Sequence, residues 1–167
     1  PIVDIWSRTP PIPPGTQWMT FLRNHDELTL EMVTPEVRQW MWEQYAPEPR
    51  MRLNLGIRRR QLPLLDGHKP RWFLLNALFL SLPGAPILYY GDEIGMGDDI
   101  WLADRNGVRT PMQWNANENA GFSQAQETYL PLIEDEVFGY KTVNVAAQED
   151  DADSYLNLTR FLVSTRQ

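Results

Sequence analysis

The sequence of 167 residues contains no cysteine. Disulfide bonds, thiolate catalysis and cysteine-based metal sites are therefore excluded. Only two histidines are present, which argues against a transition-metal site. The lack of cysteine fits a reducing compartment, so a cytoplasmic location is the expectation.

Basic residues are fewer than acidic ones: 15 Lys and Arg stand against 22 Asp and Glu, giving a formal net charge of −7. A nucleic acid or an anionic membrane would require a basic field, so neither is expected as a partner. Basic residues gather only at Arg58-Arg59-Arg60. This short cluster predicts a solvated helix face.

A long hydrophobic run is also missing. The longest apolar stretch, residues 72–82, is shorter than the ~20 residues that cross a bilayer, and it predicts a buried helix. The chain starts at Pro1 rather than Met, so we expect that the true N-terminus lies upstream.

Two short apolar runs, at 18–22 and 86–90, predict strands. Neither run alternates with polar residues, which is typical of parallel strands buried on both faces. The proline-rich segment 10–15 predicts a loop before the first strand. The order of strand, helices and strand predicts an α/β sheet or barrel.

Three helices are expected, at 35–45, 70–82 and 154–166. Thr34 caps the first, Pro35 occupies its first turn and Pro47 stops it. Its apolar face is predicted to consist of Val37, Trp40, Met41 and Tyr45. Asp151 or Asp153 is the expected cap of the last helix.

A long segment rich in Gly, Asp and Asn, residues 91–122, predicts a functional loop. Trp101, Trp114 and Phe122 are expected to anchor it. Its carboxylates at positions 98, 99 and 104 have the oxygen ligands that calcium needs, but their spacing is irregular. Solvated carboxylates are the simpler interpretation.

The triplet His25-Asp26-Glu27 directly follows the first predicted strand. Taken alone, Asp26 could be a helix cap or a surface carboxylate. Beside a histidine, and with Asn24 to orient its neighbours, it can instead accept hydrogen bonds from two hydroxyls of a sugar. The second strand ends in Gly91-Asp92-Glu93, for which a functional role and simple pairing with arginines are equally good interpretations.

These residues resemble the α-amylase superfamily, glycoside hydrolase family 13. The resemblance rests on four motifs, in the family's order: residues 21–26 (Phe-Leu-Arg-Asn-His-Asp), 87–96, 106–114 and 139–148. The extended forms at 24–31 and 101–109 are most similar to the trehalose synthase branch. The resemblance implies the C-terminal portion of a (β/α)8 TIM barrel, about the last two β/α units plus the long loop after the last strand. Residues 1–167 would then form one partial catalytic domain, because the whole barrel needs ~250 residues.

The resemblance also implies roles for four residues. Asp26 would be the catalytic carboxylate that holds two hydroxyls of the reacting glucose, and His25 would bind the same ring. Arg105 would line the sugar pocket and Glu27 would border the second glucose site. No cofactor or metal is implied in this chain, although a calcium ion elsewhere in the parent protein stays open, as does an oligomer of the parent.

The implied activity is interconversion of maltose and trehalose by transfer of a glucosyl unit, with free glucose as the transient partner. No residues resemble the family's nucleophile motif or its acid/base glutamate, so the fragment by itself is expected to be inactive. Two alternatives stay open: an α-glucosidase or oligo-1,6-glucosidase of the same superfamily, and a non-catalytic sugar-binding or transporter-associated relative.

Overall fold

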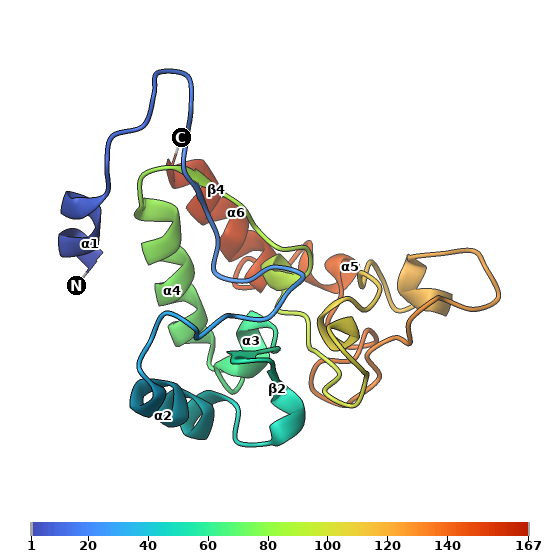
Figure 1. Ribbon diagram of the computed structural model, residues 1–167. Coiled ribbons are helices and arrows are strands. Elements are labelled where there is room, and N and C mark those ends of the chain that lie inside the picture. The colour runs from blue at the N-terminus through green and yellow to red at the C-terminus, as the bar shows by residue number, and fades with distance from the viewer. Residues whose placement is uncertain (1, 167) are drawn as a thin grey trace.

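The computed structural model describes residues 2–166. The helices and strands are, in chain order, α1 (Ile2–Arg8), β1 (Met19–Thr20), α2 (Pro35–Tyr45), β2 (Arg52–Leu53), β3 (Gly56–Ile57), α3 (Gln61–Leu64), α4 (Lys69–Ser81), β4 (Ala85–Pro86), α5 (Val145–Gln148) and α6 (Tyr155–Arg166). Short 3-10 turns lie at Pro49–Met51, Asp92–Ile94, Asn106–Val108 and Glu118–Gly121. Helix α1, which was not predicted, precedes the expected proline-rich loop and lies at the N-terminal edge of the molecule (Figure 1).

Strands β1 and β4 pair in parallel, with Met19 opposite Ala85 and Thr20 opposite Pro86. The predicted parallel pairing is therefore confirmed. The predicted burial is wrong, because Met19 is 67% exposed and Ile87 is 41% exposed. Each strand is also much shorter than its apolar run, since among the described residues no third strand extends this sheet.

Helix α2 follows its sequence signals closely. The Thr34 hydroxyl accepts a hydrogen bond from the Val37 amide, and Pro35 starts the first turn. The predicted apolar face is only partly correct, because Val37 and Trp40 are exposed. Met41, Trp42 and Tyr45 instead pack around the buried side chains Leu30, Ala46 and Ile57.

Helices α4 and α6 lie side by side and form the largest helix–helix contact (Figure 1). Phe79 and Leu80 of α4 meet Leu162 of α6 in one apolar cluster. His68 is exposed, and its ring accepts a hydrogen bond from the Arg71 amide, so that it caps α4. The cap of α6 is neither predicted aspartate: the Ser154 hydroxyl accepts from the Asn157 amide.

The hairpin of β2 and β3 was not predicted. Arg52 pairs with Ile57 in antiparallel register, and Ile57 also exchanges two backbone hydrogen bonds with Leu28. This bridge places the segment after β1 against the hairpin. It fixes the backbone directly after Glu27.

The arginine cluster contradicts its prediction of a solvated helix face. Arg58, Arg59 and Arg60 lie in extended chain between β3 and α3, and Arg60 has no exposed surface. Arg59 donates to both carboxylate oxygens of Asp98 at 3.0 Å. Buried charges require partners of this kind, and these partners lie some 39 positions away in sequence.

The long loop after β4 is ordered by small and aliphatic residues rather than by its aromatics. Val108, Met112 and Ala120 are buried, and the Gln113 side chain donates to the backbone of Phe138 and Val143. Trp101, Trp114 and Phe122, the predicted anchors, are all about half exposed or more. Among the described residues, no helix is long and apolar enough to span a membrane.

Candidate active site

Arg105 brings together two of the predicted site residues. Its Nε donates to Asp26 Oδ1, and its Nη2 lies 3.0 Å from Glu27 Oε2. The partners are 79 and 78 positions apart in sequence. Because β1 and β4 run in parallel, the segments that leave their carboxyl ends can meet at one edge, as in α/β enzymes.

Local geometry orients Asp26. The Asn24 side chain accepts from the Asp26 amide at 2.8 Å, and Asp26 Oδ1 accepts from the Glu27 amide at 3.0 Å. Asn24 therefore orients its neighbour, as predicted. The Asp26 side chain is 41% exposed, and its Oδ2 accepts no hydrogen bond from the described residues.

Glu27 is much less accessible, with its side chain 12% exposed. Its Oε1 accepts from the Asn54 side chain at 2.7 Å and from Arg105 at 3.3 Å. Asn54 was not foreseen as a site residue. The signal that could have indicated it is its place in the tight β2–β3 turn, where it adopts a positive φ of 51°.

His25 is exposed, and its backbone carbonyl accepts from Arg109 Nε at 2.9 Å. The structure therefore places His25 beside Asp26 in the chain as a solvent-exposed residue. Arg109 belongs to the resemblance motif at 106–114, but no pattern in the sequence indicates it as a site residue.

The charges of the cluster stabilise one another. Contacts with Glu27 and the hydrogen bond from Arg105 hold the pKa of Asp26 well below its usual range. The same pairing with Asp26 raises the pKa of Arg105. Asp26 is thus ionised at neutral pH and can act as a hydrogen-bond acceptor for hydroxyl groups.

The carboxylates at the end of the second predicted strand form a different environment. Asp92 is buried, and its Oδ1 lies 3.5 Å from Arg60 Nη1 without a hydrogen bond. Burial raises the pKa of Asp92 to about 6 despite the arginine. Of the two interpretations left open for Asp92, the pairing with an arginine is the one that the structure supports.

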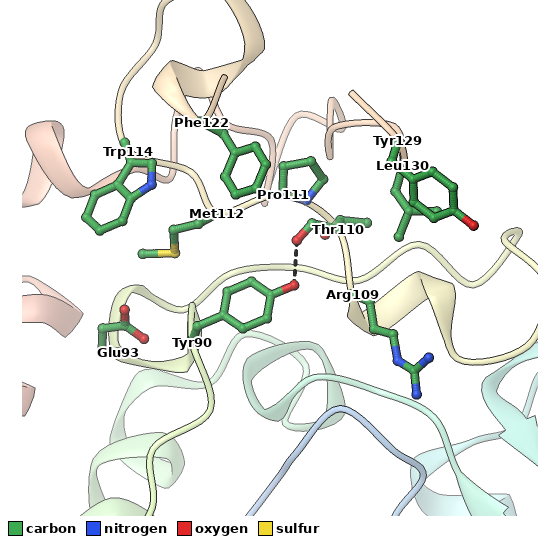
Figure 2. Close-up of a pocket in the computed structure, with 10 residues that line it drawn as sticks. All are labelled: Tyr90, Glu93, Arg109, Thr110, Pro111, Met112, Trp114, Phe122, Tyr129 and Leu130. Atoms are coloured by element: carbon green, nitrogen blue, oxygen red, sulfur yellow. Dashed lines mark hydrogen bonds between the residues drawn. The ribbon is translucent and has the colours of Figure 1, made fainter. Parts of the chain in front are cut away.

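A cleft of about 500 Å³ lies between Tyr90 and the loop residues 109–130. Its walls are the aromatic and aliphatic side chains that Figure 2 shows, with Glu93 and Arg109 as the charged groups. The Tyr90 hydroxyl donates to the Thr110 carbonyl at 2.7 Å across its floor. Arg109 links this cleft to the segment that carries the cluster, because it lines the cleft and its Nε donates to the carbonyl of His25, the residue before Asp26.

The loop carboxylates do not form a metal centre. Asp98 is paired with Arg59 and also accepts from the Arg60 amide at 2.6 Å. Within residues 2–166, no group of three or more His, Cys, Asp or Glu residues is arranged to hold a metal ion.

Comparison with known proteins identifies the family. The family model for the α-amylase catalytic domain matches residues 16–167, which is most of the chain. The chain belongs to the α-amylase catalytic-domain family. The resemblance carried by the four motifs is thereby confirmed.

Two curated relatives of this α-amylase family member match it over its whole length. The trehalose synthase/amylase TreS of Mycobacterium tuberculosis is 59% identical over 169 residues, covering 100% of this chain and 28% of the relative. The trehalose synthase of Pimelobacter is 57% identical over 169 residues, covering 100% and 30%. The chain spans less than a third of the length of these relatives.

Solved structures show the same fold. Isomaltulose synthase from Erwinia rhapontici, solved with D-glucose, matches with a TM-score of 0.57 at 22% identity, covering 89% of this chain and 27% of that one. At this identity the match supports the α-amylase domain fold alone.

Proposed function

We propose that residues 1–167 are the C-terminal part of the (β/α)8 catalytic barrel of an enzyme that interconverts maltose and trehalose. In this arrangement β1 and β4 are two neighbouring barrel strands, and the loop after β4 is the long loop after the last strand. Two findings support the proposal: the parallel pairing of β1 with β4, and the trehalose synthases that are 57–59% identical across the chain.

The observation that carries the proposed function is the Asp26–Arg105–Glu27 cluster. Asp26 holds two hydroxyls of the reacting glucose through its exposed carboxylate, while Arg105 keeps it ionised and oriented. Contacts of this kind tighten as the sugar ring flattens toward its oxocarbenium-like transition state. They therefore stabilise the transition state more than the bound substrate.

The remaining residues define the two ends of the sugar pocket. His25 binds the same glucose ring as Asp26 from its exposed position. Glu27, held by Asn54 and Arg105, borders the second glucose unit, which is released and then recaptured in a new orientation. The aromatic cleft next to Arg109 offers the apolar surface on which the C–H faces of sugars stack.

The proposed chemistry is a double displacement with retention. A nucleophilic carboxylate and an acid/base carboxylate ~5 Å apart are needed for it. In this proposal both lie in a part of the parent protein outside residues 1–167. The isolated 167-residue chain is therefore expected to leave maltose and trehalose unchanged, and turnover by that chain alone would contradict this arrangement.

The deciding experiment replaces Asp26 in the full-length parent protein. Asp26→Asn should lower the rate of maltose conversion by at least about a hundredfold, because the hydroxyl contacts are worth several kcal/mol in the transition state. Glu31→Gln, an exposed carboxylate in the same segment, is the matched control and should keep the parent rate. Equal rates for the two variants would overturn the assignment of Asp26.

The products formed by the unaltered parent separate the alternatives. Trehalose from maltose supports the proposed interconversion, whereas glucose alone indicates an α-glucosidase. Binding of maltose without any product would indicate the non-catalytic relative. Each outcome can be read from one chromatogram of the reaction mixture together with a binding titration.

A further inference from the structure

The loop that carries Arg105 is folded around a single buried side chain. Arg58 is 8% exposed, and its guanidinium donates to the carbonyl oxygens of Ile100 at 2.7 Å, Leu102 at 2.6 Å and Asp104. Its Nε donates in addition to the Arg50 carbonyl at 2.6 Å. Three alternate carbonyls of one short loop thus converge on one cation.

The geometry of the loop explains why these carbonyls point inward. The Asp99 amide donates to the Gly107 carbonyl at 3.0 Å and closes the loop at its base. A Cβ at Gly107 would overlap the Asp99 carbonyl oxygen, so glycine is required for this close approach. The planar fork of an arginine carries five donors on three nitrogens, whereas a lysine has three donors on one nitrogen and cannot reach four carbonyls that lie on different sides of the side chain.

The carbonyl next to Arg105 is the one that matters for the site. Asp104 adopts a left-handed backbone with a φ of 51°, which is costly for a residue other than glycine. The hydrogen bond from Arg58 to its carbonyl stabilises this conformation. The turn made there directs Arg105 back toward Asp26 and Glu27.

We propose that Arg58 is a positioning residue for the reaction, because it fixes the loop from which Arg105 holds Asp26 and Glu27. The proposal rests on the proposed function. Arg58 does not reach the sugar itself. It determines the position of Arg105. Through Arg105 it influences whether the released glucose is retained for transfer or is replaced by water.

The test is Arg58→Lys in the full-length parent, with Arg52→Lys as the matched control. Arg52 also donates to two backbone carbonyls, Ala46 at 2.8 Å and Pro47 at 3.2 Å, and among the described residues it makes no hydrogen bond or ion pair with the loop of Arg105. For each variant the ratio of glucose released to disaccharide isomerised is measured, together with thermal stability. Arg58→Lys should raise this ratio about threefold to tenfold, the effect of one or two lost hydrogen bonds, while Arg52→Lys leaves it unchanged.

A merely structural role predicts a different pattern. If both variants lower the melting temperature alike and neither changes the product ratio, the proposal is overturned. Arg105→Lys and the double variant complete a double-mutant cycle. Effects on the product ratio that simply add would also count against Arg58 acting through Arg105.

A second readout keeps this test apart from the failure of the proposed function. Hydrogen–deuterium exchange of residues 99–108 should be faster in Arg58→Lys than in Arg52→Lys, whatever reaction the parent catalyses. If the unaltered parent forms no trehalose, the proposed function fails but loop exchange still tests the positioning. Unchanged exchange in Arg58→Lys overturns the role of Arg58 even if trehalose is formed.

Discussion

Two arginine–carboxylate pairs in this molecule have the same chemistry and different surroundings. In the Arg59–Asp98 pair the side chains are 14% and 3% exposed, whereas in the Arg105–Asp26 pair they are 25% and 41% exposed. Both oxygens of Asp98 are occupied by protein donors. Asp26 keeps one oxygen without a protein donor among the described residues and accessible to water. A sugar hydroxyl can replace that water as hydrogen-bond donor.

The comparison separates structural from functional carboxylates on physical grounds. A buried pair holds the fold because either partner alone would be an unpaired buried charge. An exposed pair contributes little to stability, since solvent screens it. What an exposed pair can offer is an acceptor held in place and still accessible to ligand.

The largest effect on the free energy of unfolding is expected when the buried Arg59–Asp98 pair is broken. Asp98→Ala leaves Arg59 without its carboxylate and removes the acceptor of the Arg60 amide, so the free energy of unfolding should fall by about 4 kcal/mol. Chemical denaturation of the full-length parent, followed by a probe of this domain, measures it. A loss as small as that of a surface pair would show that Arg59 finds another partner and would weaken the distinction.

The next effect is the pH dependence of the free energy of unfolding, for which the buried Asp92 is compared with the exposed Asp26. Burial raises the pKa of Asp92 to about 6, above about 3.9 in the unfolded chain. The folded state therefore binds this proton more tightly than the unfolded chain. The resulting contribution of Asp92 to the free energy of unfolding is fully present below about pH 4 and is lost as the pH rises through 6. The difference amounts to about 3 kcal/mol.

Unfolding of the parent and of Asp92→Asn between pH 4 and 7 tests this sign. The difference between the two curves should change across the window and level off only near pH 7, one unit above the pKa of Asp92 in the folded state. For Asp26 the pKa is lowered, so its contribution has the opposite sign: it is present above the unfolded pKa and lost as the solution becomes more acidic. Parallel curves for parent and Asp92→Asn would refute the burial argument.

The smallest effect is expected at the exposed pair. Asp26→Ala should change the free energy of unfolding by at most about 1 kcal/mol, although it abolishes most of the proposed activity. Glu149→Ala provides the reference. Both side chains of the Arg160–Glu149 pair are about half exposed, and neither residue belongs to the candidate site. If Asp26→Ala destabilised the protein as much as Asp98→Ala, the cluster would have to be regarded as structural.

Local sequence signals predicted three of the described helices, α2, α4 and α6, and missed the shorter α1, α3 and α5. Thr34 with Pro35 located the start of α2, and the apolar run before Pro83 located α4 almost to the residue. Caps and helix stops act within one turn, so they can be read from neighbouring residues. The exposure of Trp40 was not predicted, because no local signal shows which side of a helix packs against the rest of the chain.

Charge burial could not be read from the sequence. Arg58-Arg59-Arg60 has the composition of a surface cluster, and its partners are carbonyls and carboxylates about 40 positions downstream. Likewise, the apolar character of β1 predicted burial, but burial depends on strands that would flank it. The predicted parallel pairing is confirmed, although the burial on both faces from which it was inferred is not present in the described residues.

The candidate site was predicted in part. Asp26 and Asn24 follow from their place after a strand, and Arg105 and Glu27 came from the family resemblance. That Arg105 joins both carboxylates depends on a long loop folding back, and no periodicity encodes that. Asn54 and Arg58 were missed for the same reason, since each acts on residues far away in sequence.

The closed base of the loop at Gly107 has a consequence for how this sequence can diverge. Because any side chain there would collide with the Asp99 carbonyl, position 107 cannot drift even to alanine while the loop keeps its shape. Position 104 is left-handed and its side chain is 56% exposed, so asparagine or glycine can replace aspartate there. Trp101 is exposed and its ring lies 4.3 Å from the Arg50 guanidinium, so a substitution there changes a surface contact while the base of the loop at Gly107 keeps its shape.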